Sequence, residues 1–239
     1  MIANFLNESL TKGLIFNIEK NKSWNKVIDK VLTKIPKSAV PNVICPFSKL
    51  ETVIDWKIQV PRWKQTKYGV TYQRSDVKIP KVNIDAETLE LLYKNTFDVE
   101  NLRNVFEIAK NVNVSGTIYN IYNFNIVAFN TTKFKTVDDL TKAKILSNEK
   151  YLESNGKEYH VNKTGELTIY HEFGHVFDNN NNRISENGNW TTLVNRWLSD
   201  GAPDVCKSPS EAFAEAFANY YGAGGVNIPP YIKEFIKSL

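Results

Sequence analysis

Apolar residues near the start of the chain recur at the spacing of one face of an α-helix. The positions follow i, i+3, i+4, i+7, i+8 and i+11: Trp24, Val27, Ile28, Val31, Leu32 and Ile35. Ser23 stands where an N-cap is expected, and Pro36 stands where the helix must stop. The pattern therefore predicts an amphipathic helix between these two residues.

Patterns further along the chain predict helices around a small sheet. Residues 41–80 are punctuated by proline and favour short strands and loops. Residues 115–134, dense in β-branched and aromatic side chains, favour one or two strands. Helices are expected over residues 86–94, 99–111, 165–178, 189–198, 209–221 and 231–239. The expected fold class is α+β.

Charge divides the chain into two regions. Residues 1–80 carry 14 Lys and Arg against 6 Asp and Glu, whereas residues 81–239 carry 16 against 20. We predict a basic N-terminal region of unknown role over 1–80 and a separate domain over 81–239. The basic region is either a solvated surface or a face for an anionic partner, such as a membrane surface, a cell-wall polymer or nucleic acid. The net charge of the whole chain is only +4, so a dominant nucleic-acid function is not expected.

The chain shows neither a membrane-spanning stretch nor a secretory signal. No segment approaches the roughly 18 consecutive apolar residues of a spanning helix. The first 20 residues lack a basic segment, a continuous apolar run and a small-residue cleavage site, so the localisation stays open. Cys45 and Cys206 are too few for a disulfide framework or a thiolate zinc cluster. They could form one bridge, although buried free thiols are the favoured interpretation.

One motif carries chemistry. Two of the three histidines of the chain lie in His171-Glu172-Phe173-Gly174-His175, an H-E-x-x-H pattern. Residues four apart on a helix lie about 40° apart around its axis, so both imidazoles can reach one metal ion. Glu172 lies about 100° round from His171. There its carboxylate can accept a proton from a water that the metal activates. An ordinary buried helix with two surface histidines is the alternative.

A catalytic metal site needs a third protein ligand, and the candidates lie downstream. Glu211 and Glu215 are four residues apart in a segment otherwise rich in Ala and Phe, where two carboxylates need partners. We predict Glu211 as the third ligand and Glu215 as the acceptor of the outer N–H of a ligand histidine. Two alternatives stay open: the two roles could be exchanged, or Ser208 and Glu211 could form a capping box behind Pro209.

Asp178 and the nature of the metal complete the predicted site. Asp178 follows His175 by three residues and either forms a hydrogen bond within the site or caps the end of the helix. Histidine and carboxylate ligands with one open position fit Zn²⁺ best, although cobalt or manganese could occupy such a site.

The two motifs together resemble one family. HEFGHVFD at 171–178 and EAFAEAF at 211–217 are similar to the gluzincin metallopeptidases typified by the catalytic domain of anthrax lethal factor and by the secreted clostridial Pro-Pro endopeptidases. The resemblance covers about residues 115–239 and implies a zincin-like domain. It implies that His171, His175 and Glu211 bind zinc, that Glu172 is the general base, and that an edge strand within 115–134 aligns a peptide substrate.

The chain departs from this family at one position. Family members place a tyrosine seven residues before the ligand glutamate, where it stabilises the oxyanion of the tetrahedral intermediate. Here that position is Asp204. His160 or a tyrosine within 119–122 could substitute. Losing one oxyanion donor costs roughly 100- to 1,000-fold in rate, so the departure bears on turnover rather than on metal binding.

Three functions follow as expectations. The first is a zinc endopeptidase, toxin-like, that hydrolyses a protein or peptide substrate and uses residues 1–80 for docking or delivery. The second is a structural or virion-associated protein with a zinc-binding domain of weak or no activity; similar domains occur in bacteriophage virion proteins. The third is a regulatory metallopeptidase that cleaves a repressor, although no DNA-binding helix-turn-helix accompanies the motif. The protein is accordingly expected in the cytoplasm, exported by a non-Sec route, or in a virion.

Overall fold

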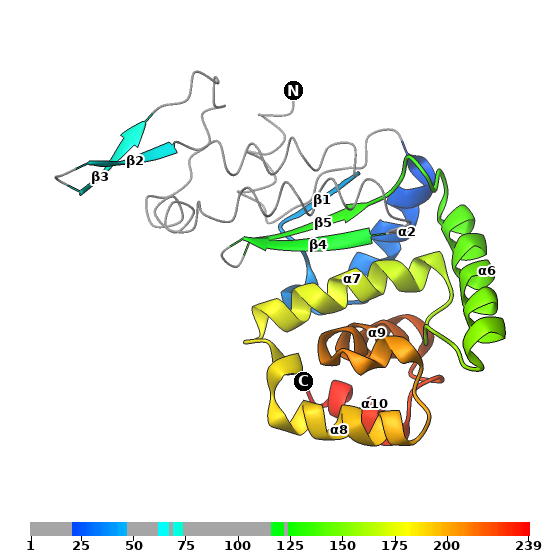
Figure 1. The fold of residues 1–239 in the computed structure, drawn as a ribbon. Helices are drawn as coiled ribbons and strands as arrows, with labels where there is room; N and C mark the ends of the chain where they lie inside the picture. The colour runs from blue at the N-terminus through cyan, green and yellow to red at the C-terminus, as the bar shows by residue number, and fades with distance from the viewer. Residues whose placement is uncertain (1–20, 47–61, 67–68, 74–115, 122–123) are drawn as a thin grey trace.

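The computed structural model describes residues 21–46, 62–66, 69–73, 116–121 and 124–239, whose arrangement is shown in Figure 1. The helices predicted over 86–94 and 99–111 lie outside the described residues, as does much of the segment 41–80.

The strands form two small sheets. One has three strands in the order β1-β5-β4, formed by β1 (Val43–Pro46), β5 (Phe124–Phe129) and β4 (Gly116–Ile121). Strand β1 runs parallel to β5, and β4 runs antiparallel to it with Gly116 opposite Phe129. The other sheet is the hairpin of β2 (Arg62–Thr66) and β3 (Gly69–Gln73). Two strands therefore occupy the segment for which one or two were predicted.

The described part of the chain is mostly helical. Its α-helices are α2 (Lys22–Leu32), α6 (Val137–Asn155), α7 (Gly165–Asn180), α8 (Gly188–Ser199), α9 (Pro209–Ala223) and α10 (Pro230–Lys237). Short 3₁₀ helices are η1 (Lys37–Ala39), η3 (Ile184–Glu186) and η4 (Asp204–Lys207). The predicted helices at 165–178, 189–198, 209–221 and 231–239 are confirmed within a few residues at their ends. Helices together with a small sheet are present, as the expected α+β fold class requires.

Helix α2 follows the predicted apolar pattern but begins earlier than expected. Asn21 rather than Ser23 is its N-cap, and its side chain accepts a hydrogen bond from the Trp24 backbone N–H at 3.3 Å. Trp24 is fully buried, and its indole N–H donates to the Phe134 carbonyl at 2.9 Å. Further along the chain, strand β1 pairs with strand β5. Residues 21–46 therefore pack into the same body as the C-terminal helices, and the boundary predicted at residue 80 stays a prediction.

Helix α6 was not expected from the sequence. Of its 19 residues only Val137, Leu140 and Asn148 are buried, so no continuous apolar stripe marks it. Its ends are nevertheless specified locally. Thr136 and Asp139 form a capping box at the N-terminus, and Gly156 ends the helix at a φ of 70°, which favours glycine.

The elements stack in layers, with the β4 side of the sheet on α7, α7 on α9, and α9 on α8 and α10 (Figure 1). Helix α7 lies in the middle and is buried on nearly all sides. It approaches α9 closely at Gly174, where an added Cβ would lie 3.0 Å from the Cα of Ala214. The absence of a side chain at Gly174 thus lets the two helices that carry the predicted ligands come together.

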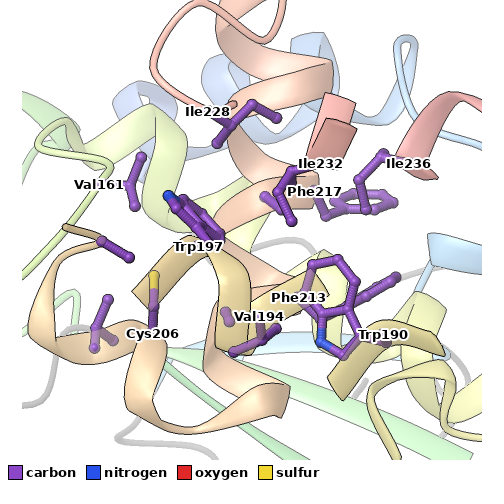
Figure 2. Close-up of a cluster of buried hydrophobic side chains, with 14 of the residues drawn as sticks. Val161, Trp190, Val194, Trp197, Cys206, Phe213, Phe217, Ile228, Ile232 and Ile236 are labelled. Atoms are coloured by element: carbon purple, nitrogen blue, oxygen red, sulfur yellow. The ribbon is translucent and has the colours of Figure 1, made fainter. Parts of the chain in front are cut away.

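Two apolar clusters hold these layers. One lies beneath α9, where Trp190, Val194 and Trp197 of α8 meet Phe213 and Phe217 of α9 (Figure 2). The other lies between α7 and the sheet and includes Trp24, Phe129, Tyr170 and Phe173. Cys206 is a free, buried thiol within the first cluster, in agreement with the favoured interpretation. Within the described ranges, no helix has the length and apolar character needed to cross a membrane.

Candidate metal centre

Helix α7 presents the two histidines of the motif side by side. Thr164 caps its N-terminus, accepting a hydrogen bond from the Leu167 backbone N–H at 3.2 Å. One turn separates His171 from His175, and their Nε2 atoms lie 3.2 Å apart. Their side chains are only 10% and 11% exposed. The four-residue spacing therefore brings the Nε2 atoms of both rings close enough to approach one metal ion, as predicted.

Helix α9 brings Glu211 to the same point. Glu211 Oε2 lies 3.1 Å from His171 Nε2, and Glu211 Oε1 lies 3.5 Å from His175 Nε2. Ser208 caps α9 by accepting a hydrogen bond from the Glu211 backbone N–H at 3.4 Å. The Glu211 carboxylate lies next to the two histidines and not next to the helix cap. Glu211 thus contributes its backbone to the helix start and its side chain to the site.

These three side chains fit a metal ion. One ligand atom from each of His171, His175 and Glu211 can be chosen so that all lie within 4.8 Å of one another. Zinc bonds to nitrogen and oxygen of about 2.0–2.1 Å imply ligand atoms about 3.3 Å apart around a tetrahedron. Two separations come close to that value: 3.1 Å between His171 Nε2 and Glu211 Oε2, and 3.2 Å between the two histidine Nε2 atoms. The structure supports a site for a metal ion, and its geometry alone does not name the metal.

The outer nitrogen of each histidine faces a different partner. His171 Nδ1 lies 3.4 Å from Glu215 Oε1, which is within ion-pair distance, although no hydrogen bond joins the two atoms. His175 Nδ1 lies 3.3 Å from the Ser210 hydroxyl oxygen. Such partners orient ligand rings and select their tautomer. Sequence reasoning missed Ser210, because a serine in the first turn of a helix signals a cap as readily as a histidine partner.

Glu215 is fully buried and held from several sides. Its Oε2 accepts hydrogen bonds from the Asn162 backbone N–H at 2.9 Å and the Asn162 side-chain amide at 2.7 Å. Its Oε1 lies 3.1 Å from His160 Nδ1. Burial raises the pKa of this carboxyl, but His160 and His171 outweigh burial and hold the pKa well below its usual range. Nothing in the sequence indicated that Asn162 holds this carboxylate. His160, one of the residues considered as an oxyanion donor, contacts Glu215 through its Nδ1.

Electrostatics within the cluster favour an ion pair. Burial lowers the pKa of His171, but its interactions with the carboxylates of Glu211 and Glu215 outweigh burial and raise it to about 10. Burial likewise raises the pKa of Glu211, and its interactions with His171 and His175 outweigh that effect and depress it. The cluster therefore holds anionic carboxylates that attract a positive charge, either a proton on His171 or a metal ion.

Glu172 lies beside the ligands and beneath strand β4. It is 7% exposed, and burial raises the pKa of its carboxyl. A Cβ added at Gly116 of β4 would lie 3.0 Å from Glu172 Oε1, so the glycine makes room for this carboxylate. A buried carboxyl with a raised pKa is suited to accept and return a proton.

Asp178 does not touch the histidines. It accepts hydrogen bonds from the Ser185 backbone N–H at 2.8 Å and from the Ser185 hydroxyl at 2.5 Å. Of the two roles left open, the carboxylate therefore serves the turn that follows α7. The outer nitrogen of His175, Nδ1, faces the Ser210 hydroxyl and not Asp178.

Asp204 also serves a local structure. Its carboxylate pairs with Lys157 and Lys207 and accepts a hydrogen bond from the Tyr151 hydroxyl at 2.6 Å. Lys157, then Tyr151 and Lys207, hold the pKa of Asp204 well below its usual range. The residue at the position where the resemblance calls for a tyrosine therefore anchors η4 to the end of α6. The tyrosines within 119–122, which were considered as substitute oxyanion donors, have side chains that lie outside those described.

Comparisons with known proteins do not assign the chain: no family model matches it, and neither a curated protein nor a solved structure matches it significantly.

Proposed function

We propose that this chain is a zinc-dependent endopeptidase of the H-E-x-x-H gluzincin class, with a zincin-like domain. The observation that carries the proposal is the convergence of His171, His175 and Glu211 from two helices, with Glu172 buried beside them. The placement of the sheet against α7, with β4 at one of the two edges of its described strands, supports the same assignment.

In this proposal His171, His175 and Glu211 hold the ion. When bound, Zn²⁺ supplies a Lewis acid that polarises the substrate carbonyl and lowers the pKa of a water to about 7. Glu172 accepts the proton of the attacking water and delivers it to the leaving amine. Glu215 and Ser210 keep the two imidazoles oriented. Strand β4 would align an extended peptide next to Glu172.

A second candidate is a virion-associated or structural protein whose zinc site turns over slowly or not at all. One observation favours it: Asp204 is engaged with Lys157, Lys207 and Tyr151, so this position offers no donor to an oxyanion. The partner of the peptidase is a protein or peptide substrate, and the basic region 1–80 is either a solvated surface or a face for an anionic partner.

The test is a paired measurement on the full chain and on Glu172→Gln. Zinc content is determined by elemental analysis, and cleavage is followed with a proteome-derived peptide library. We expect about one zinc in both proteins and cleavage by the wild type only. Zinc in both proteins with no cleavage by either would favour the second candidate. Absence of zinc from both would overturn the metal site itself.

A further inference from the structure

A small pocket opens next to the proposed metal centre, on the side of α6. Its volume is about 170 Å³, and its polar lining comes from Lys133, Lys144, Ser147 and His160, with Phe134 among its apolar walls. Pockets that hold whole small molecules measure roughly 300–1,000 Å³. The size of this pocket therefore suits a side chain or a chain end rather than a cofactor.

His160 connects the pocket to the metal centre. It lines the pocket and lies 3.1 Å from Glu215 Oε1 through its Nδ1, and Glu215 in turn lies 3.4 Å from His171 Nδ1. Asn148 of α6 accepts hydrogen bonds from the backbone N–H groups of Tyr159 at 2.9 Å and His160 at 3.1 Å. The position of His160 between pocket and site is therefore fixed by the same helix that carries Lys144.

Lys144 is a pocket cation that makes no ion pair within the described part of the chain. It lies one helical turn before Asn148, on the same face of α6, and is half-buried. Among the residues that the structure describes, it has no hydrogen-bond or ion-pair partner. Burial, the largest effect, lowers the pKa of Lys144, and the nearby charges of Glu215, Glu172 and Glu211 offset only part of that effect. None of these carboxylates forms an ion pair with the Lys144 ammonium, so a carboxylate that enters the pocket can pair with it and stabilise its charged form.

Resting on the proposed peptidase function, we propose that this pocket is a substrate subsite for a carboxylate of the peptide, with Lys144 as its cationic anchor. The Ser147 hydroxyl and the His160 ring complete a polar lining, and the apolar walls receive the stem of the side chain. The carboxylate has two sources: an Asp or Glu side chain near the scissile bond, or the C-terminus of a short peptide. A charge-assisted hydrogen bond from an ammonium is suited to either.

The experiment uses the full-length chain loaded with Zn²⁺ and a peptide library that varies Asp and Glu against Asn and Gln at each position. Each peptide is made both as the free acid and as the C-terminal amide, which separates the two sources. Two readouts are taken: kcat and KM for cleavage by the wild type, and capture of uncut peptides by Glu172→Gln. The variants are Lys144→Met and Lys144→Arg, with Lys142→Met as the control, because Lys142 is exposed on the same helix.

We expect a preference for a carboxylate of about 10- to 100-fold in both readouts. Lys144→Met should abolish it mainly through KM, while Lys144→Arg and Lys142→Met keep it. No preference, or a preference that survives Lys144→Met, overturns the subsite. An equal loss for acidic and neutral peptides in Lys144→Met also overturns it, since Lys144 would then act on the reaction centre. If the wild type cleaves nothing, the peptidase proposal fails, and capture by Glu172→Gln still decides the subsite.

Discussion

His171 lies between two glutamates at the candidate metal centre: its Nδ1 is 3.4 Å from a carboxylate oxygen of Glu215, and its Nε2 is 3.1 Å from a carboxylate oxygen of Glu211. The two glutamates stand one turn apart on α9, and each meets a different nitrogen of the same ring. In the proposed site Glu211 would therefore bind the ion, and Glu215 would orient the His171 ring.

Replacing Glu215 by Gln should weaken zinc binding by about 10- to 100-fold, because the carboxylate that orients His171 is lost. Competition with a chromophoric chelator measures the change. Asp178→Asn is the matched control, since Asp178 is also a buried carboxylate on these helices, and within the described ranges its carboxylate accepts hydrogen bonds from Ser185 alone. Its zinc affinity should stay at the wild-type value. An equal loss of affinity in both variants would contradict the assignment of Glu215.

Gly116→Ala should reduce cleavage while leaving zinc in place. The new Cβ would lie 3.0 Å from Glu172 Oε1 and 3.1 Å from the Phe129 ring, so the carboxylate must move. A misplacement of about 1 Å costs on the order of 100-fold in rate, so the smaller shift expected here should lower kcat by about 10-fold. Kinetic assays of peptide cleavage measure kcat, and elemental analysis of the same preparation measures the zinc content. Unchanged kcat would show that Glu172 has no need of the space beneath β4.

Gly174→Ala should destabilise the protein by about 1–3 kcal/mol, because the methyl group would press on the α9 backbone at Ala214. Urea denaturation measures the free energy of unfolding. Gly188→Ala is the control, since nothing lies within 4 Å of the Cβ it adds. It should change stability little, or raise it by about 0.4–1 kcal/mol. Equal effects of the two substitutions would argue against close packing of α7 on α9.

Zinc binding should release a proton near neutral pH. In the metal-free protein the pKa of His171 is raised to about 10, so the ring is protonated at pH 7, whereas a ligand imidazole must be neutral. The apparent zinc affinity should therefore rise about tenfold per pH unit between about pH 7 and 9. Calorimetric titration in two buffers of different ionisation enthalpy detects the proton. Identical enthalpies in the two buffers would rule this proton out.

Removing zinc should make stability depend on alkaline pH. Because the pKa of His171 rises from 6.5 to about 10 on folding, its protonation contributes full stability below pH 6.5. That contribution is lost as the pH rises towards 10. The melting temperature of the chelator-treated protein should therefore fall over this window more steeply than that of the zinc-loaded protein, which serves as the control. Parallel curves would show that His171 carries no extra proton.

Much of the fold and part of the site could be predicted from local patterns. The spacing of His171, Glu172 and His175 is a property of one helix, and α7 forms with the ends that its cap and apolar residues specify. Helix α6 escaped prediction because it buries little, and its amphipathic pattern is correspondingly weak. The N-cap of α2 was misplaced because Asn21 and Ser23 are both competent caps and only one has the required geometry.

What the sequence by itself determined is therefore the chemistry within single helices: a histidine pair with a flanking carboxylate, and two glutamates one turn apart. Only the tertiary structure decided which glutamate meets which imidazole nitrogen. It also gave His175 its partner Ser210, gave Asp178 its partner Ser185, and brought Lys144 of α6 beside the site. The physical reason is that helical periodicity acts over a few residues, whereas these contacts join elements whose relative position is set by packing, as at Gly174 and Ala214.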